Sequence, residues 1–196
     1  MKRRAGIMLA GSLLALGLWS LTAYSADDDD DKKLNKEAQE AVIKLMESVK
    51  GKKGDVKAQA EAMKKKFEEL KPIMWVYKPR KKGGIGFGKD GDDIEQTIGK
   101  VGSRTAKGMT PAKIKAMKDD LIKSAEITKA ISEVTDLYAG QYAKKDAAKW
   151  KGYTKEMRKG ADDLIEAANG GNVDQIKKAA NNLSASCTNC HSDFRE

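Results

Sequence analysis

The last stretch of the chain, residues 173–196, carries an apolar stripe that runs into two cysteines and the only histidine. Positions on this stripe recur at intervals of three and four residues, and they are Val173, Ile176, Ala180, Leu183, Cys187, Cys190 and Phe194. That spacing predicts a helix with all of these side chains on one face. We therefore expect both cysteines to point into the same interior as the aliphatic residues.

A second stripe ends just before this one and consists of Trp150, Tyr153, Met157, Ala161, Leu164 and Ala168. The sequence NGGN at 169–172 supplies a glycine cap and a short turn, so the two helices should be antiparallel neighbours. Three further stripes predict helices over 34–45, 56–74 and 110–140, and the glycines of 77–93 predict a long loop. The expected fold is all-α: an antiparallel four-helix bundle with one additional helix and a long glycine-rich loop.

The first 25 residues have the composition of a secretory signal. A basic start, MKRR, precedes a long apolar stretch, and small residues lead up to Ser25. We predict a signal peptide at 1–25, a flexible acidic leader at 26–33 and a single helical domain at 34–196. The protein is then periplasmic or otherwise exported, and no stable membrane insertion is expected after cleavage; a retained membrane anchor is the alternative.

The C-x-x-C-H motif at Cys187, Cys190 and His191 is compatible with few chemistries. A thioredoxin-type dithiol requires the pair at the start of a helix beside a βαβ unit, whereas this pair lies near the end of a helix. A structural zinc site requires further ligands, and the sequence contains no other cysteine or histidine. Covalent haem requires only what is present, namely two thiols for the vinyl groups and an imidazole for the iron. A plain disulfide remains the alternative.

Helix geometry supports the haem assignment. Positions i, i+3 and i+4 lie on one face of a helix, so both sulfurs and the imidazole can meet the same flat macrocycle. An exported chain is also where such attachment is expected. We predict one covalent haem c, attached at Cys187 and Cys190, with His191 as the proximal iron ligand.

The chain resembles the class II c-type cytochromes, the cytochrome c′ and cytochrome c556 group. The resemblance lies in a C-x-x-C-H motif at the end of the last helix, followed by Phe194 and Arg195, in a helical domain behind a signal sequence. It is clearest over 146–196 and weaker over 34–75, which is similar to that family's first hairpin. It implies a bundle of cytochrome c′ type and an exported redox protein with one iron, and residues 78–140 are expected to be an addition.

Members of that family differ in the residue that lies on the other side of the iron from the histidine. A methionine there gives a six-coordinate electron carrier, whereas an apolar residue leaves the iron open to nitric oxide or carbon monoxide. Met46, on the expected first helix, is the candidate distal ligand. Methionines at helical spacing are, however, commonly core residues, and the family's distal position falls near 34–37, where no methionine occurs. Met46, another methionine and an open site all remain alternatives.

The sequence therefore predicts an electron-transfer protein rather than an enzyme, with a five-coordinate gas-binding protein as the alternative. Peroxidase-like turnover would require a polar distal acid or base, and the chain has no second histidine. The formal net charge is +9, which suits an acidic redox partner, while export argues against nucleic acid. The partner itself is unknown, and a homodimer through an exposed apolar helix face is a further expectation.

Overall fold

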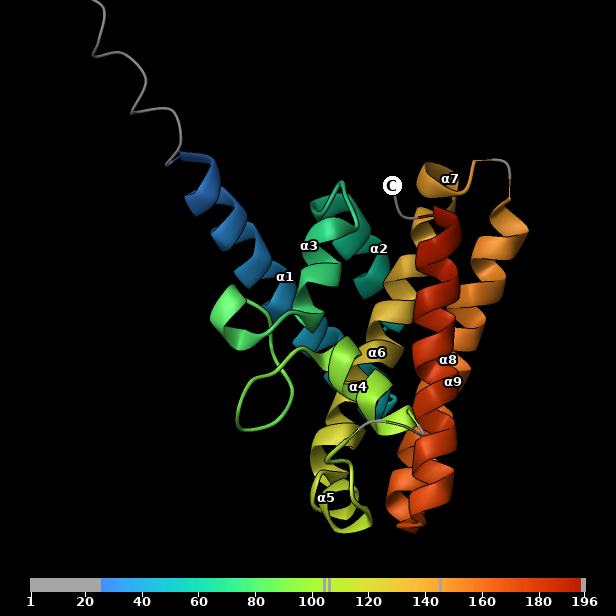
Figure 1. Cartoon of the computed structure of the whole chain (residues 1–196). Coiled ribbons are helices and arrows are strands. Elements are labelled where there is room, and N and C mark those ends of the chain that lie inside the picture. Colours follow the sequence, from blue (N-terminus) through green and yellow to red (C-terminus); the bar gives the residue numbers. More distant parts are fainter. Residues whose placement is uncertain (1–25, 104, 106, 145, 195–196) are drawn as a thin grey trace, which may run out of the picture.

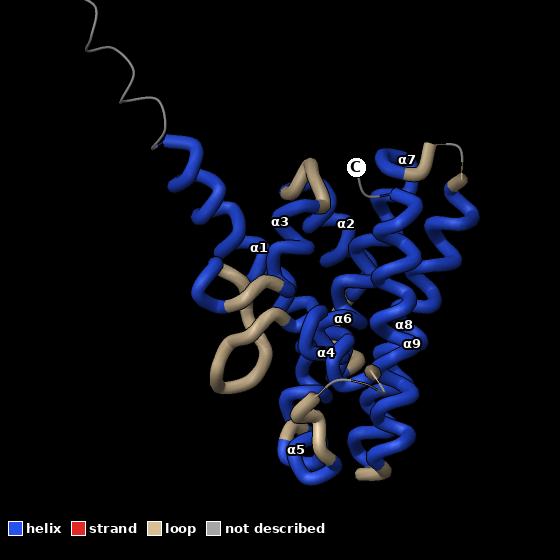
Figure 2. The backbone as a smooth tube through the Cα atoms, viewed as in Figure 1, coloured by secondary structure: helices blue, strands red, loops and turns tan. Residues whose placement is uncertain are grey.

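The computed structural model describes residues 26–103, 105, 107–144 and 146–194, so the predicted signal peptide lies outside the described residues. Figures 1 and 2 show helices joined by loops, with a long loop before α4. An isolated bridge between Phe87 and Asp92, within that loop, is the only β-type pairing among the described residues. The predicted all-α fold is confirmed. None of the described helices is both long and apolar enough to cross a membrane.

The helices follow one another as α1 Ala26–Gly51, α2 Val56–Lys66, α3 Lys71–Met74, α4 Ile94–Gly102, α5 Pro111–Ala116, α6 Lys118–Thr135, α7 Ala139–Tyr142, α8 Ala147–Gly170 and α9 Val173–Phe194. Three short 3-10 turns lie between them: η1 Trp75–Tyr77, η2 Arg80–Lys82 and η3 Asp136–Tyr138. Helix α8 packs against α9 on one side and α6 on the other, and α4 lies along α9 (Figure 1). Helix α1 packs against α6 and is covered by α2 and α3.

The hairpin of α8 and α9 forms as its sequence predicts. Helix α8 begins at the cap Asp146, whose carboxylate accepts a hydrogen bond from the Lys149 amide, and it ends at Gly171 in the left-handed conformation (φ 70°). Asn172 then accepts hydrogen bonds from the amides of Asp174 and Gln175 at the start of α9. These caps satisfy free backbone groups at both helix ends and hold the short turn in place.

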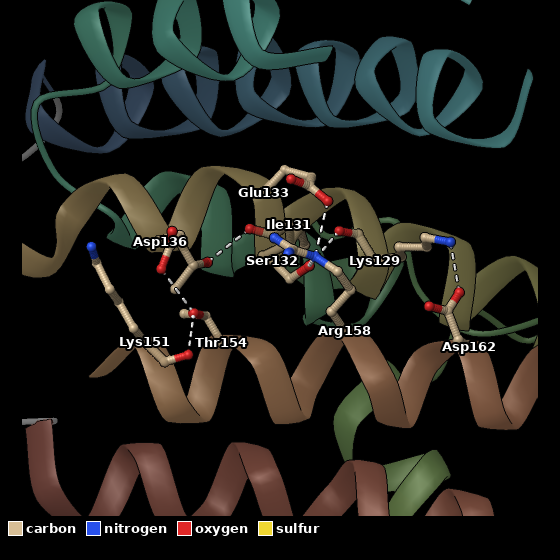
Figure 3. Close-up of polar contacts among 10 residues, drawn as sticks. Lys129, Ile131, Ser132, Glu133, Asp136, Lys151, Thr154, Arg158 and Asp162 are labelled. Carbon is tan, nitrogen blue, oxygen red and sulfur yellow. Dashed lines mark hydrogen bonds and ion pairs between the residues drawn. The ribbon is translucent and has the colours of Figure 1, made fainter. Parts of the chain in front are cut away.

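Polar contacts join α6 to α8 behind this hairpin (Figure 3). The Arg158 guanidinium lies 2.9 Å from a carboxylate oxygen of Glu133 and donates to the Ser132 hydroxyl, while the Thr154 hydroxyl donates to Asp136. Buried aliphatic residues of α6, such as Leu121 and Ile131, fill the interior. Burial of this apolar surface is the main stabilising contribution, and the polar contacts fix how the helices sit against each other.

Three of the predicted segments differ from the structure. The helix expected over 56–74 ends at Lys66, because Phe67 is extended and buries its ring, and the chain becomes helical again at α3, which has a proline in its first turn. The helix expected over 110–140 is divided at Met117 into α5 and α6. The acidic leader 26–33, expected to be flexible, forms the start of α1, where carboxylates are favourable near the positive end of the helix dipole.

The short helix α4 was not predicted, although its sequence carries a weak signal. Asp93 caps it by accepting a hydrogen bond from the Gln96 amide at 3.0 Å, and Ile94, Ile98 and Val101 form its buried face. At its end a Cβ on Gly102 would lie only 2.5 Å from the backbone nitrogen of Asn181 in α9. A side chain larger than hydrogen at this position would push the two helices apart.

We therefore expect Gly102→Ala to lower the free energy of unfolding by about 1–3 kcal/mol, the usual cost of forced overpacking. Gly152 in α8 has open space around its Cβ position, so Gly152→Ala is the matched control and should be neutral or stabilising by about 0.5–1 kcal/mol. Denaturant unfolding of both variants measures the difference. Equal stability of the two variants would contradict the close contact of α4 with α9.

Candidate functional site

The last two turns of α9 present the C-x-x-C-H motif at one end of the bundle. Cys187, Cys190 and His191 are each half-buried, and both sulfurs belong to free thiols. The cysteines pack against the hydrophobic core, as the apolar stripe predicts. The motif is therefore turned toward the interior while keeping part of its surface accessible.

Burial keeps both thiols neutral. It raises the pKa of Cys187 to about 12, with further contributions from the Glu95 carboxylate and Cys190. Burial likewise raises the pKa of Cys190 to about 11, assisted by Asp193. Both groups are thus protonated thiols at neutral pH, which suits apolar vinyl groups as partners better than a bare cation, because a cation would require thiolates.

A carboxylate from another helix faces the histidine. The Glu95 Oε1 atom, in the first turn of α4, lies 3.5 Å from the Nδ1 atom of His191. A carboxylate at Nδ1 favours the tautomer that carries its proton there, which leaves the Nε2 lone pair for a metal. Contact between α4 and α9 therefore orients the one imidazole of the chain.

Side chains of α8 hold the end of α9 in place. The Trp150 ring meets the Phe194 ring edge to face, with centroids 5.3 Å apart, and the Trp150 indole donates to the Thr135 carbonyl. Asp193 accepts hydrogen bonds from the Lys149 ammonium and the Tyr153 hydroxyl, which hold the pKa of its carboxyl below the usual value. These contacts fix the position of the turn that carries the motif.

Tyr77, in η1, was missed in the sequence because it falls at the start of the glycine-rich loop. Its side chain is buried, and its hydroxyl has no hydrogen-bond partner among the described residues. Burial raises the pKa of the phenol, Cys187 raises it further, and the Thr128 side chain lowers it. The sequence offers no signal for the burial of this residue, because that burial arises only in the folded chain.

Met46 is placed away from the helices that pack most closely on the motif. It is buried in the core of α1, a helix that packs against α6 and against α2 and α3. The main neighbours of α9 are α8 and α4. The assignment of Met46 as distal ligand stays a prediction, but the helix that was expected to carry the distal face is not the one lying along α9.

A family model described as Cytochrome C′ matches residues 91–195, more than half of the chain. The chain belongs to the cytochrome c′ family. Comparison with curated proteins and with solved structures gives no match. As a member of this family the protein is a haem-binding c-type cytochrome.

The residues covered by the match change the expected boundary between the family's part of this cytochrome c′ and the additional part. Residues 34–75, expected to resemble the first hairpin, lie outside the match, and most of 78–140, expected to be an addition, lies inside it. The contacts agree, because α4 rather than α1 lies along α9. Helices α4–α9 lie inside the match, and α1–α3 lie outside it and form an additional segment.

The residues at the motif fit a haem group. No set of three His, Cys, Asp or Glu side chains in the described part of the chain is grouped to hold a bare metal ion, whereas a macrocycle supplies its own nitrogens. Two neutral thiols and an oriented imidazole lie on one helix face.

We expect Glu95→Gln to raise the reduction potential of the haem iron. A carboxylate at Nδ1 makes the imidazole a stronger donor and favours the ferric state, and the amide removes that charge. Glu166→Gln, an exposed change on α8, is the charge-matched control and should leave the potential unchanged. Redox titration of both holoproteins is the measurement, and equal shifts in the two variants would rule out a specific role for Glu95.

Proposed function

We propose that this cytochrome c′ is an exported electron carrier with a single haem c. Cys187 and Cys190 hold the haem as thioethers, and His191 ligates the iron. The observation that carries the proposal is the C-x-x-C-H motif at the end of α9 in a member of a haem-binding family. When bound, the haem supplies an iron that cycles between two oxidation states.

Each residue of the motif has a defined task in this proposal. The thiols are neutral and half-buried, so they face the apolar vinyl side of the macrocycle without the cost of burying a charge. Glu95 holds the imidazole with Nε2 free for iron. Trp150 and Phe194 cover the neighbouring surface and limit the access of water, which influences the reduction potential.

An alternative function is supported by the placement of Met46. Helix α1, which carries Met46, packs against α6 and lies outside the family match. The main neighbours of α9 are α8 and α4, so these contacts give no support for Met46 as the ligand opposite His191. An iron without a sixth protein ligand would bind nitric oxide or carbon monoxide. This cytochrome would then be a gas-binding protein rather than a carrier.

The cellular setting is part of the proposal. Export rests on the signal-peptide character of residues 1–25. Removal of Lys2, Arg3 and Arg4 with the signal peptide takes the formal net charge from +9 to +6, and this basic balance supports an acidic protein as redox partner. We propose a carrier rather than an enzyme, because the chain has no second histidine to act as a distal acid or base.

Covalent attachment is tested directly on the mature holoprotein. Haem should remain with the polypeptide during denaturing electrophoresis, and Cys187→Ala combined with Cys190→Ala should abolish this retention. Thr188→Ala, an exposed change between the two cysteines, is the matched control and should retain haem. Release of free haem from the wild-type protein would overturn the haem c assignment.

The iron ligands are tested by optical spectra of the reduced protein with and without carbon monoxide. We expect Met46→Leu to leave the spectrum unchanged, at a cost of less than about 1.5 kcal/mol for a volume-conserving core change. His191→Ala should remove the axial nitrogen and change the spectrum strongly. A carbon monoxide complex in the wild type favours the gas-binding function, and conversion from low to high spin by Met46→Leu would identify Met46 as the distal ligand.

A further inference from the structure

Three aromatic rings form a continuous chain from the surface of the molecule to the last turn of α9. Tyr142, at the end of α7, is 38% exposed, and its ring stacks on Trp150 with centroids 5.8 Å apart. Trp150 is buried and meets Phe194 edge to face, with centroids 5.3 Å apart. Phe194 lies one helical turn beyond Cys190 on the apolar face of α9. Ring contacts therefore connect an exposed side chain to the turn that follows the C-x-x-C-H motif.

Hydrogen bonds hold the first two rings in this arrangement. The Tyr142 hydroxyl accepts a hydrogen bond from the Leu70 amide at 3.2 Å, and the Trp150 indole donates to the Thr135 carbonyl at 2.9 Å. The planes of the two rings are only 8° from parallel. Stacked and edge-to-face pairs are the favoured arrangements of aromatic side chains, so the chain of rings is a stable part of the fold.

The exposed end of this chain lies in a small apolar patch. Among the described residues, the large hydrophobic side chains that are exposed are Ile43, Leu137 and Tyr142. Leu137 belongs to η3 and Tyr142 to α7, which pack against each other, whereas Ile43 lies on α1. Figure 1 shows α7 at the same end of the bundle as the last turn of α9. Interfaces between redox proteins are small, so a patch of this size suits a transient partner.

Two lysines flank this apolar patch. The Lys64 ammonium lies 3.8 Å from the centroid of the Tyr138 ring and donates to the Gln141 Oε1 atom, and Lys144 is exposed. Neither ammonium forms an ion pair with a carboxylate of the described residues. These uncompensated charges attract an acidic surface and steer its approach. We call the surface formed by Lys64, Leu137, Tyr142 and Lys144 the α7 face.

Contact between the rings also favours the passage of an electron. Electron tunnelling through a protein slows with every gap between atoms that are not in contact. The ring chain spans the distance from the surface to the end of α9 without such a gap, and the burial of Trp150 keeps water out of its middle.

We propose that an acidic redox protein docks on the α7 face and that the rings of Tyr142, Trp150 and Phe194 are the path of the electron between this protein and the haem. In one direction a single electron leaves the ferrous iron, which becomes ferric, and reduces an oxidised centre of the partner. No bond forms or breaks, and no proton moves. This inference rests on the proposed function and adds to it the docking face and the residues of the path.

The test uses hexacyanoferrate(III), an anionic one-electron oxidant, as the probe. Stopped-flow absorbance follows the oxidation of reduced holoprotein, and the reduction potential of each variant is measured so that rates are compared at known driving force. Retention of haem by the wild type in denaturing electrophoresis is established first. Loss of haem would overturn the proposed function and this inference together, whereas the rates of haem-loaded variants test this inference alone.

At low ionic strength we expect Lys144→Glu to slow oxidation several-fold, because it reverses a charge on the α7 face, and the difference should disappear at high salt. Lys178→Glu is the charge-matched control. Lys178 is exposed near the start of α9, at the other end of this helix from the motif, so its reversal should have a much smaller effect. Equal slowing by the two variants would overturn docking at the α7 face.

Tyr142→Leu should slow oxidation at an unchanged reduction potential, and at high salt as well, because it removes the ring stacked on Trp150 and leaves a gap in the path. Tyr142→Phe restores the ring without the hydroxyl that accepts from Leu70, so it should recover the rate lost in Tyr142→Leu. This recovery separates the ring path from a structural role of the hydrogen bond. Haem-loaded Tyr142→Leu that is oxidised as fast as the wild type overturns the proposal.

Discussion

The close contact between α4 and α9 is the constraint on which the site depends. Gly102 lets the end of α4 touch the backbone of α9 at Asn181. Because the helices run antiparallel, the start of α4 then lies beside the last turns of α9, and Glu95 reaches the Nδ1 atom of His191. A helix of only nine residues thus orients the one imidazole of the chain through a contact made at its far end.

The additional segment α1–α3 enlarges the core. It packs on α6, on the side away from the α8 and α9 hairpin, and passes through η1 into the glycine-rich loop. The ion pair between Lys78 and Asp93 joins this loop to the cap of α4.

The electrostatic character of the site agrees with its proposed chemistry. The two half-buried thiols and the buried Tyr77 phenol are neutral, so bringing a flat apolar macrocycle against them displaces no buried charge. The carboxylate of Glu95 lies on the imidazole side, where it strengthens donation from His191. The charged residues of the last turn, such as Asp193, are satisfied by Lys149 and Tyr153 at the surface.

The sequence by itself determined the all-α class, the α8 and α9 hairpin and the position of Cys187, Cys190 and His191 on one helix face, because these depend on local periodicity and capping. It did not determine that α4, rather than α1, packs along α9. Helix α4 is short, and its contact with α9 joins Gly102 to Asn181, two residues far apart in the sequence. Nor did the sequence reveal the burial of Tyr77, which lies at the start of a loop that folds back tightly at Gly84. Local patterns specify the helices, whereas close packing of distant segments decides which helix and which side chain complete the site.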